Sequence, residues 1–192
     1  MEKLSFKPLS VKNWDDLEDL FGNRGACGGC WCMTWRLTHK IWQAGKGASN
    51  KRRLKSLVKL GQSPGILAYK GQRPIGWCSV APRRDFITLQ RSRVLAPIDA
   101  EDVWSISCLF IARAYRGKGV SVQLLRAAAK FVEKRGGKIV EGYPVVPYTT
   151  RMPDVFAWTG TLAAFERAGF IEVARRSKAR PIMRIECHKT TV

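Results

Sequence analysis

The chain has 192 residues, 45% of them hydrophobic and 26% charged, a composition typical of one folded domain and unlike that of a disordered chain. Its 34 Lys and Arg against 15 Asp and Glu give a net charge of +19, which favours anionic partners, although a generally solvated basic surface is an equally good interpretation. No stretch approaches the roughly 20 apolar residues of a membrane span, and the first residues show no secretory pattern. We therefore expect a cytoplasmic protein with no membrane partner. In that compartment its six cysteines should be thiols or ligands. The expected oligomeric state is a monomer or a homodimer.

The first third of the chain predicts one strand, two helices and a loop. Residues 4–9 alternate as in a strand, and 11–21 carry apolar residues at helical spacing. The glycine-rich residues 22–29 predict a loop, and the apolar run 31–35 allows a short strand. A second helix follows over residues that include 54–60.

The middle of the chain predicts a hairpin, a buried strand and a long helix. Two apolar runs, 66–69 and 75–80, flank a turn of the type found in hairpins. Residues 103–111 are mostly apolar, as in a buried central strand. An amphipathic helix then ends at Gly136 and Gly137.

The last part predicts a strand over 138–146, a short helix over 162–167 and a closing pair of strands within 171–185. The resulting order of strands and helices alternates in the way that an α/β domain does. We therefore expect an α/β fold around one mixed sheet.

The segment RGKGVS, residues 116–121, lies between the central strand and the long helix. Its two glycines allow the backbone to approach an anion, and the helix N-terminus adds partial positive charge. The spacing is not that of a Walker loop, and the third glycine of a dinucleotide fingerprint is missing. The pattern therefore indicates a turn that binds an anion.

This segment resembles motif A of the GNAT superfamily of acyl-CoA transferases, R/Q-x-x-G-x-G/A, with Arg116, Gly119 and Ser121 at the fixed positions. Ser121 departs mildly from the usual Gly or Ala. ILAYKGQRPIGWCSV resembles the preceding hairpin, VWSISCLFIARAYRGKG the central strand, and AAFERAGFIEV the later helix. EGYPV, FERAGFIEVARR and RPIMR resemble a bacterial subgroup of this superfamily whose acceptors are mostly unassigned.

The resemblance implies one GNAT domain over 1–192, with a mixed, mostly antiparallel sheet, flanking helices and splayed central strands. The acceptor loops would fall at about 22–60 and the acetyl-CoA core at about 65–185. Acetyl-CoA would be the co-substrate, with its pantetheine arm on Leu109, Phe110 and Ile111. Its pyrophosphate would meet the whole of the turn, namely Arg116, Gly117, Lys118, Gly119, Val120 and Ser121.

The candidates for proton transfer depart from the family pattern. Amine acceptors are largely protonated at pH 7, so a base is needed, and a backbone N–H on the central strand can hold the oxyanion. The glutamate of histone-acetylating relatives falls on Ser105, and the tyrosine acid of many relatives falls on Phe165. Ser105 and Tyr143 are therefore the catalytic candidates, with Tyr148 as an alternative to Tyr143.

Three cysteines, Cys27, Cys30 and Cys32, cluster after the first helix. A CxxC pair binds metal when a second pair completes it, and the sequence has no second pair. Thiols that line the acceptor pocket are a further alternative. The preferred interpretation is small thiols packed under neighbouring tryptophans, with no metal.

These observations predict an N-acetyltransferase that moves an acetyl group from acetyl-CoA directly to a primary amine. The acceptor is expected to be a small molecule or a peptide, and the strongly basic charge of the protein is compatible with an anionic one. Two alternatives stay open: a basic nucleic-acid-binding module, and a GNAT fold that binds coenzyme A without catalysis.

Overall fold

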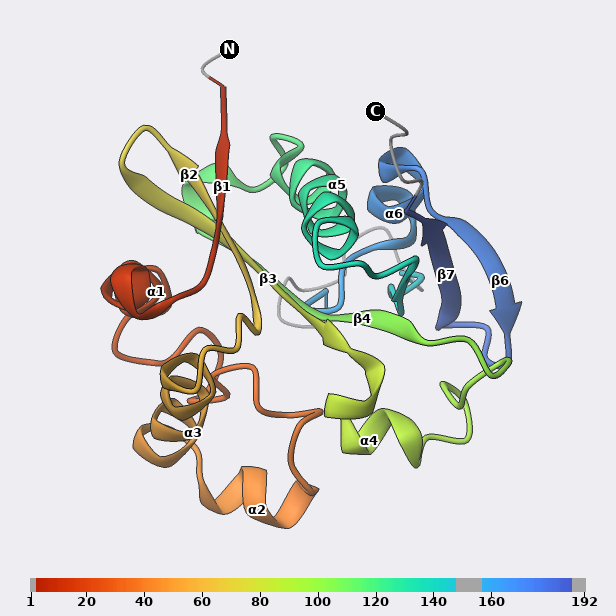
Figure 1. The fold of residues 1–192 in the computed structure, drawn as a ribbon, viewed down its shortest axis with the longest axis horizontal. Helices are drawn as coiled ribbons and strands as arrows, with labels where there is room; N and C mark the ends of the chain where they lie inside the picture. The colour runs from red at the N-terminus through yellow and green to blue at the C-terminus, as the bar shows by residue number, and fades with distance from the viewer. Residues whose placement is uncertain (1–2, 148–156, 188–192) are drawn as a thin grey trace.

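The computed structural model describes residues 3–147 and 157–187. Within them the chain forms one sheet of seven strands in the order β1-β2-β3-β4-β5-β7-β6 (Figure 1). Every neighbouring pair is antiparallel except β4 with β5. The strands are β1 (Ser5–Pro8), β2 (Gly65–Lys70), β3 (Arg73–Pro82), β4 (Val103–Ile111), β5 (Ile139–Gly142), β6 (Ile171–Arg175) and β7 (Pro181–Glu186).

Helices cover both faces of this sheet. The long α5 and the short α6 lie on one face, and α1, α3 and α2 gather on the other, beside the first half of the sheet (Figure 1). None of the helices in the described residues is long and apolar enough to cross a bilayer. The helices are α1 (Trp14–Phe21), α2 (His39–Ala44), α3 (Ala48–Lys59), α4 (Ile87–Gln90), α5 (Val120–Glu133) and α6 (Leu162–Ala168).

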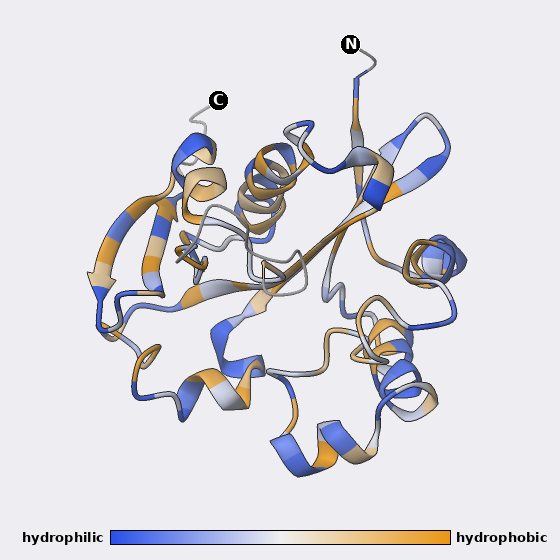
Figure 2. Cartoon of the chain, turned by 180° about the vertical axis from the view of Figure 1, so that it is seen from behind, coloured by the Kyte–Doolittle hydropathy of each residue, from blue (hydrophilic) through white to orange (hydrophobic). Residues whose placement is uncertain are grey.

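Two of the three apolar clusters in the described residues hold the longer helices to the sheet. Leu124, Leu125 and Ala128 of α5 are buried at the helical spacing that the sequence predicts. On the opposite face, Leu54 of α3 is buried in the same core as Trp77 of β3. Seen from behind, much of the central sheet carries hydrophobic colours, while α2 and α3 show broad hydrophilic bands (Figure 2).

The central strands β4 and β5 separate along their length. They pair in parallel from Val103 opposite Ile139 to Ile106 opposite Gly142. β5 ends there, whereas β4 continues to Ile111. The predicted fold class is confirmed: a mixed, mostly antiparallel sheet flanked by helices, with splayed central strands.

Local structure differs from the sequence predictions at three places. Residues 31–35 form turns rather than a strand, with left-handed φ values of 47° at Trp31 and 53° at Cys32. β5 stops at Gly142, so the predicted strand over 138–146 was too long. α2 and α4 were not predicted, because helices of six and four residues are too short to show a periodic pattern.

Candidate active site

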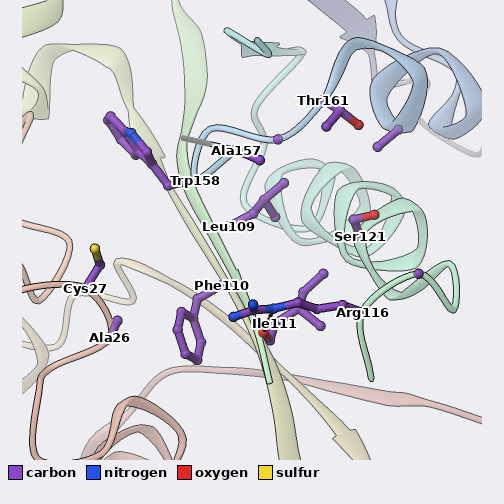
Figure 3. A pocket seen from close by; sticks show the side chains of 13 residues that line it. Ala26, Cys27, Leu109, Phe110, Ile111, Arg116, Ser121, Ala157, Trp158 and Thr161 are labelled. Atoms are coloured by element: carbon purple, nitrogen blue, oxygen red, sulfur yellow. Dashed lines mark hydrogen bonds between the residues drawn. The ribbon is translucent and has the colours of Figure 1, made fainter. Parts of the chain in front are cut away.

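A cavity of about 500 Å³ lies where β4 extends past the end of β5. The loop residues Ala26 and Cys27 lie on one side, Ser121 and Thr161 on the other, and β4 between them (Figure 3). Backbone and apolar side chains make up most of the wall. The lining residues are Ala26, Cys27, Leu109, Phe110, Ile111, Arg116, Gly117, Ser121, Ala157, Trp158, Gly160, Thr161 and Ala164.

A second hollow of about 160 Å³ adjoins the first at the N-terminus of α5. Ile111, Gly117 and Ser121 are among the residues that line both spaces. Together they form a path from the exposed turn before α5 to the apolar region beside β4. This shape suits a long ligand with an anionic part and a thin apolar part.

The turn before α5 has the geometry of an anion site. Gly117 and Gly119 have left-handed φ values of 69° and 74°, and a Cβ added to either would meet no atom within 4 Å. Gly119 is the N-cap of α5 and has no side chain that could cap the helix. The first turn of α5 contains no acidic residue. Backbone N–H groups at the start of this helix therefore face open space, where an anion is favoured.

The outer end of β4 directs backbone groups away from β3. Ala112 donates to the carbonyl of Ile75 at 2.9 Å, so the alternation of antiparallel pairs turns the N–H and C=O of Ile111 and Leu109 toward the cavity. Leu109 N–H donates to the carbonyl of Trp158 at 2.7 Å. Ile111 C=O accepts a bond from Arg116 Nε at 2.9 Å. Ile111 is therefore the position at which β4 offers its N–H to the cavity.

The structure brings most of the predicted coenzyme-binding residues together. Leu109, Phe110 and Ile111 line the large cavity with part of the turn, and Gly119 and Val120 line the smaller hollow. Lys118 lines neither space. Its ammonium lies 6.0 Å from the ring centroid of Tyr115.

Ser105 and Tyr143 lie side by side, with their hydroxyl oxygens 2.9 Å apart. Both side chains are fully buried, and neither is among the described residues that line the cavity. Burial and the neighbouring charge of Glu141 raise the pKa of Tyr143 well above its ordinary value. Tyr148 lies outside the described residues, and Phe165 is buried in the core.

The two hydroxyls belong to a buried network centred on Glu141. Tyr143 donates to Glu141 at 2.5 Å, and Arg83 pairs with the same carboxylate oxygen at 2.5 Å. Arg184 binds the other oxygen at 2.8 Å and reaches Asp99 at 2.6 Å. The Glu141 side chain is only 1% exposed, so its charge is neutralised by guanidinium groups rather than by water.

A row of aromatic rings connects this network to the cavity. Tyr143 and Trp35 have ring centroids 5.5 Å apart, and Trp35 and Trp158 are 5.3 Å apart. Trp158 lines the cavity (Figure 3). Sequence reasoning missed Trp35 and Trp158 as site residues, because neither belongs to a motif and only the fold brings them together.

The three clustered cysteines occupy different environments. Cys27 is exposed on the cavity wall, Cys30 Sγ lies 2.7 Å from the hydroxyl of Thr34, and buried Cys32 accepts a bond from Trp77 Nε1 at 3.2 Å. Burial raises the pKa of Cys30. Within the described residues, no group of three or more His, Cys, Asp or Glu side chains is placed to hold a metal ion.

Comparisons with known proteins agree with this geometry. Residues 31–170 match the model of the acetyltransferase (GNAT) family. Among solved structures, a GNAT-family acetyltransferase from Streptococcus agalactiae is 11% identical, covers 97% of this chain and 96% of its own, and superposes with a TM-score of 0.57. The paia N-acetyltransferase from Thermoplasma acidophilum, solved with coenzyme A, is 15% identical with 96% and 99% coverage and a TM-score of 0.53.

A third similar structure, yncA from Salmonella typhimurium with its cofactor acetyl-CoA, is 10% identical with 98% and 96% coverage and a TM-score of 0.54. The search of curated proteins by sequence found no match. The family model spans well over half of the chain. The chain therefore belongs to the GNAT acetyltransferase family, whose members are transferases that use acetyl-CoA, and the predicted enzyme class is confirmed.

Proposed function

We propose that this protein is an N-acetyltransferase that transfers an acetyl group from acetyl-CoA directly to a primary amine. The observation that carries the proposal is the continuous path from the glycine turn at 116–121 to the apolar cavity beside β4. A coenzyme A molecule has an anionic pyrophosphate and a thin pantetheine arm in the same order. The thioester would thus lie beside β4, where Ala26 and Cys27 form the opposite wall.

The residues present fit this co-substrate. Gly117 and Gly119 leave open space that any Cβ would fill, and the start of α5 supplies N–H groups to the pyrophosphate. Arg116, which donates to Ile111 C=O, places a cation on the wall of the large cavity. Leu109, Phe110 and Ile111 provide apolar surface and backbone groups for the pantetheine arm.

In the proposed reaction, the neutral amine nitrogen bonds to the thioester carbonyl carbon, the carbon–sulfur bond breaks, the coenzyme leaves as thiolate, and the nitrogen releases its proton to water. A thiol of pKa about 8.5 leaves readily, so an acid is helpful but not essential. We assign Ser105 and Tyr143 a positioning role, because their hydroxyls are buried and Tyr143 is separated from the cavity by Trp35, which packs behind the lining residue Trp158.

Two measurements test the proposal and separate it from its alternatives. Calorimetry with acetyl-CoA should show saturable binding at one site per chain, and absence of binding would overturn the proposal. A thiol-release assay with a panel of small amines, amino acids and peptides should show acceptor-dependent release of coenzyme A. Binding without release across this panel would favour a coenzyme A-binding fold that lacks catalysis.

A further inference from the structure

One long stretch of the sequence has no acidic residue. Between Asp19 and Asp85 the chain contains 13 Lys and Arg and neither Asp nor Glu. The stretch includes the loop that lines the cavity, all of α2 and α3, and the hairpin of β2 and β3. Four acids precede it on α1, so the charge separates along the chain rather than being mixed.

The fold gathers five exposed cations of this stretch on two consecutive helices and the turn between them, the α2–α3 surface: Lys40, Lys46, Arg52, Arg53 and Lys59. Within the described residues, none of the five lies within ion-pair distance of a carboxylate. By contrast, Lys51 and Lys55 on the same helix are half-buried and pair with Glu18 at 2.9 and 3.8 Å. The α2–α3 surface is therefore cationic after its local ion pairs are counted.

This surface adjoins the acceptor side of the cavity. Gly47, which caps α3, donates to the carbonyl of Gly29 at 2.9 Å. The side chain of Asn50 is fully buried and donates to the carbonyls of Trp42 and Gly29 at 3.1 and 3.5 Å. The loop that carries Cys27 into the cavity thus rests directly on the start of α3.

We propose that the α2–α3 surface binds the phosphate backbone of RNA beside the mouth of the cavity. Phosphates are bound by distributed Lys and Arg without a buried apolar centre. Protein interfaces, in contrast, rely on aromatic residues and are depleted of lysine. The exposed large apolar residues of this region, Ile41 and Leu60, are single residues at the two ends of the surface, which favours RNA over an acidic protein as the partner.

Fluorescence anisotropy with a labelled unstructured 20-nucleotide RNA tests the proposal in the intact protein. The triple variant Arg52→Glu, Arg53→Glu, Lys59→Glu should raise the Kd for RNA at least about tenfold at 150 mM salt. It should also reduce the slope of log affinity against log salt by about 2, for three lost phosphate contacts on a single strand. Circular dichroism and acetyl-CoA affinity should remain those of the wild type, because these side chains lie outside the coenzyme path.

A matched control separates the position of the charges from their total. The variant Lys130→Glu, Lys134→Glu, Lys138→Glu reverses three exposed lysines near the end of α5, on the opposite face of the sheet, and changes the net charge equally. Each set also removes one cation from the last turn of a helix. The control should stay within threefold of wild-type RNA affinity. Equal losses in both variants, wild-type protein that does not bind RNA, or tighter binding of a polyglutamate peptide of equal charge would each overturn the proposal.

Discussion

The two walls of the cavity are built in different ways. The wall formed by β4, the turn at 116–121 and α5 consists of backbone groups, apolar side chains and small residues from one continuous stretch of the sequence. The opposite wall joins the loop at 26–27 to Trp158. Behind Trp158, Trp35 packs against Tyr143, which belongs to a network in which Arg83, Glu141 and Arg184 meet from distant parts of the chain.

We expect the first wall to bind the coenzyme, which is the same in every reaction, and the opposite wall to contact the acceptor, which differs between enzymes. A backbone cradle at a helix N-terminus fits any acyl-CoA and tolerates substitution of its side chains, apart from its glycines. The opposite wall depends on side chains that hold one another in place. We therefore expect substitutions in the first wall to change coenzyme affinity, and substitutions behind the second wall to change stability.

The largest expected effect is on stability, from Glu141→Ala. Loss of this carboxylate leaves the buried guanidinium of Arg83 without a charged partner and removes one of the two carboxylates that bind the partly buried Arg184, which should lower the free energy of unfolding by about 3–5 kcal/mol. Urea denaturation measures this change. The control Glu172→Ala removes a glutamate that pairs with exposed Arg175 at 2.5 Å, and it should leave the midpoint almost unchanged. Similar midpoints for the two variants would show that the network does not hold the second wall.

The next largest effect is expected from Gly119→Val in the first wall, which should weaken the binding of acetyl-CoA. The new side chain would fill the space assigned to the pyrophosphate, and we expect the Kd for acetyl-CoA to rise at least tenfold, about 1.4 kcal/mol. Gly136→Val is the matched control, because Gly136 follows the other end of α5, has a φ of 78° and also faces open space. It imposes the same backbone strain without obstructing the ligand. Wild-type affinity of Gly119→Val in calorimetry would refute the assignment of the turn.

The sequence was informative where local pattern decides structure. The spacing of apolar residues along α5 and the glycines of the turn at 116–121 were sufficient to predict a helix that begins directly after a glycine turn. The apolar run 31–35 misled, because the left-handed conformation of Trp31 and Cys32 depends on packing that no short-range pattern encodes. The pairing of Glu141 with Arg83, 58 positions away, was likewise beyond local reasoning.

The substitution Tyr143→Phe distinguishes positioning from chemistry in the second wall. It keeps the ring that contacts Trp35 and removes the hydroxyl that binds Ser105 and Glu141. We expect a loss of about 1 kcal/mol of stability and a kcat within threefold of wild type. Burial raises the pKa of this phenol, so the pH–rate profile between pH 6 and 9 should not change. A hundredfold fall in kcat together with the loss of one limb of that profile would instead make Tyr143 a participant in proton transfer.

The smallest energetic effect is expected at Cys27, which makes it a good reporter of where the two walls meet. Its side chain is exposed on the cavity wall, so Cys27→Ser should change the Kd for acetyl-CoA less than twofold. In the wild type, iodoacetamide should alkylate Cys27 before the other thiols, because Cys32 and Cys78 are buried and burial also raises the pKa of Cys78. Saturating acetyl-CoA should slow this alkylation severalfold, as peptide mass mapping over time would show. Faster alkylation of Cys32 would contradict the described loop, and an unchanged rate at Cys27 would place the bound thioester away from the second wall.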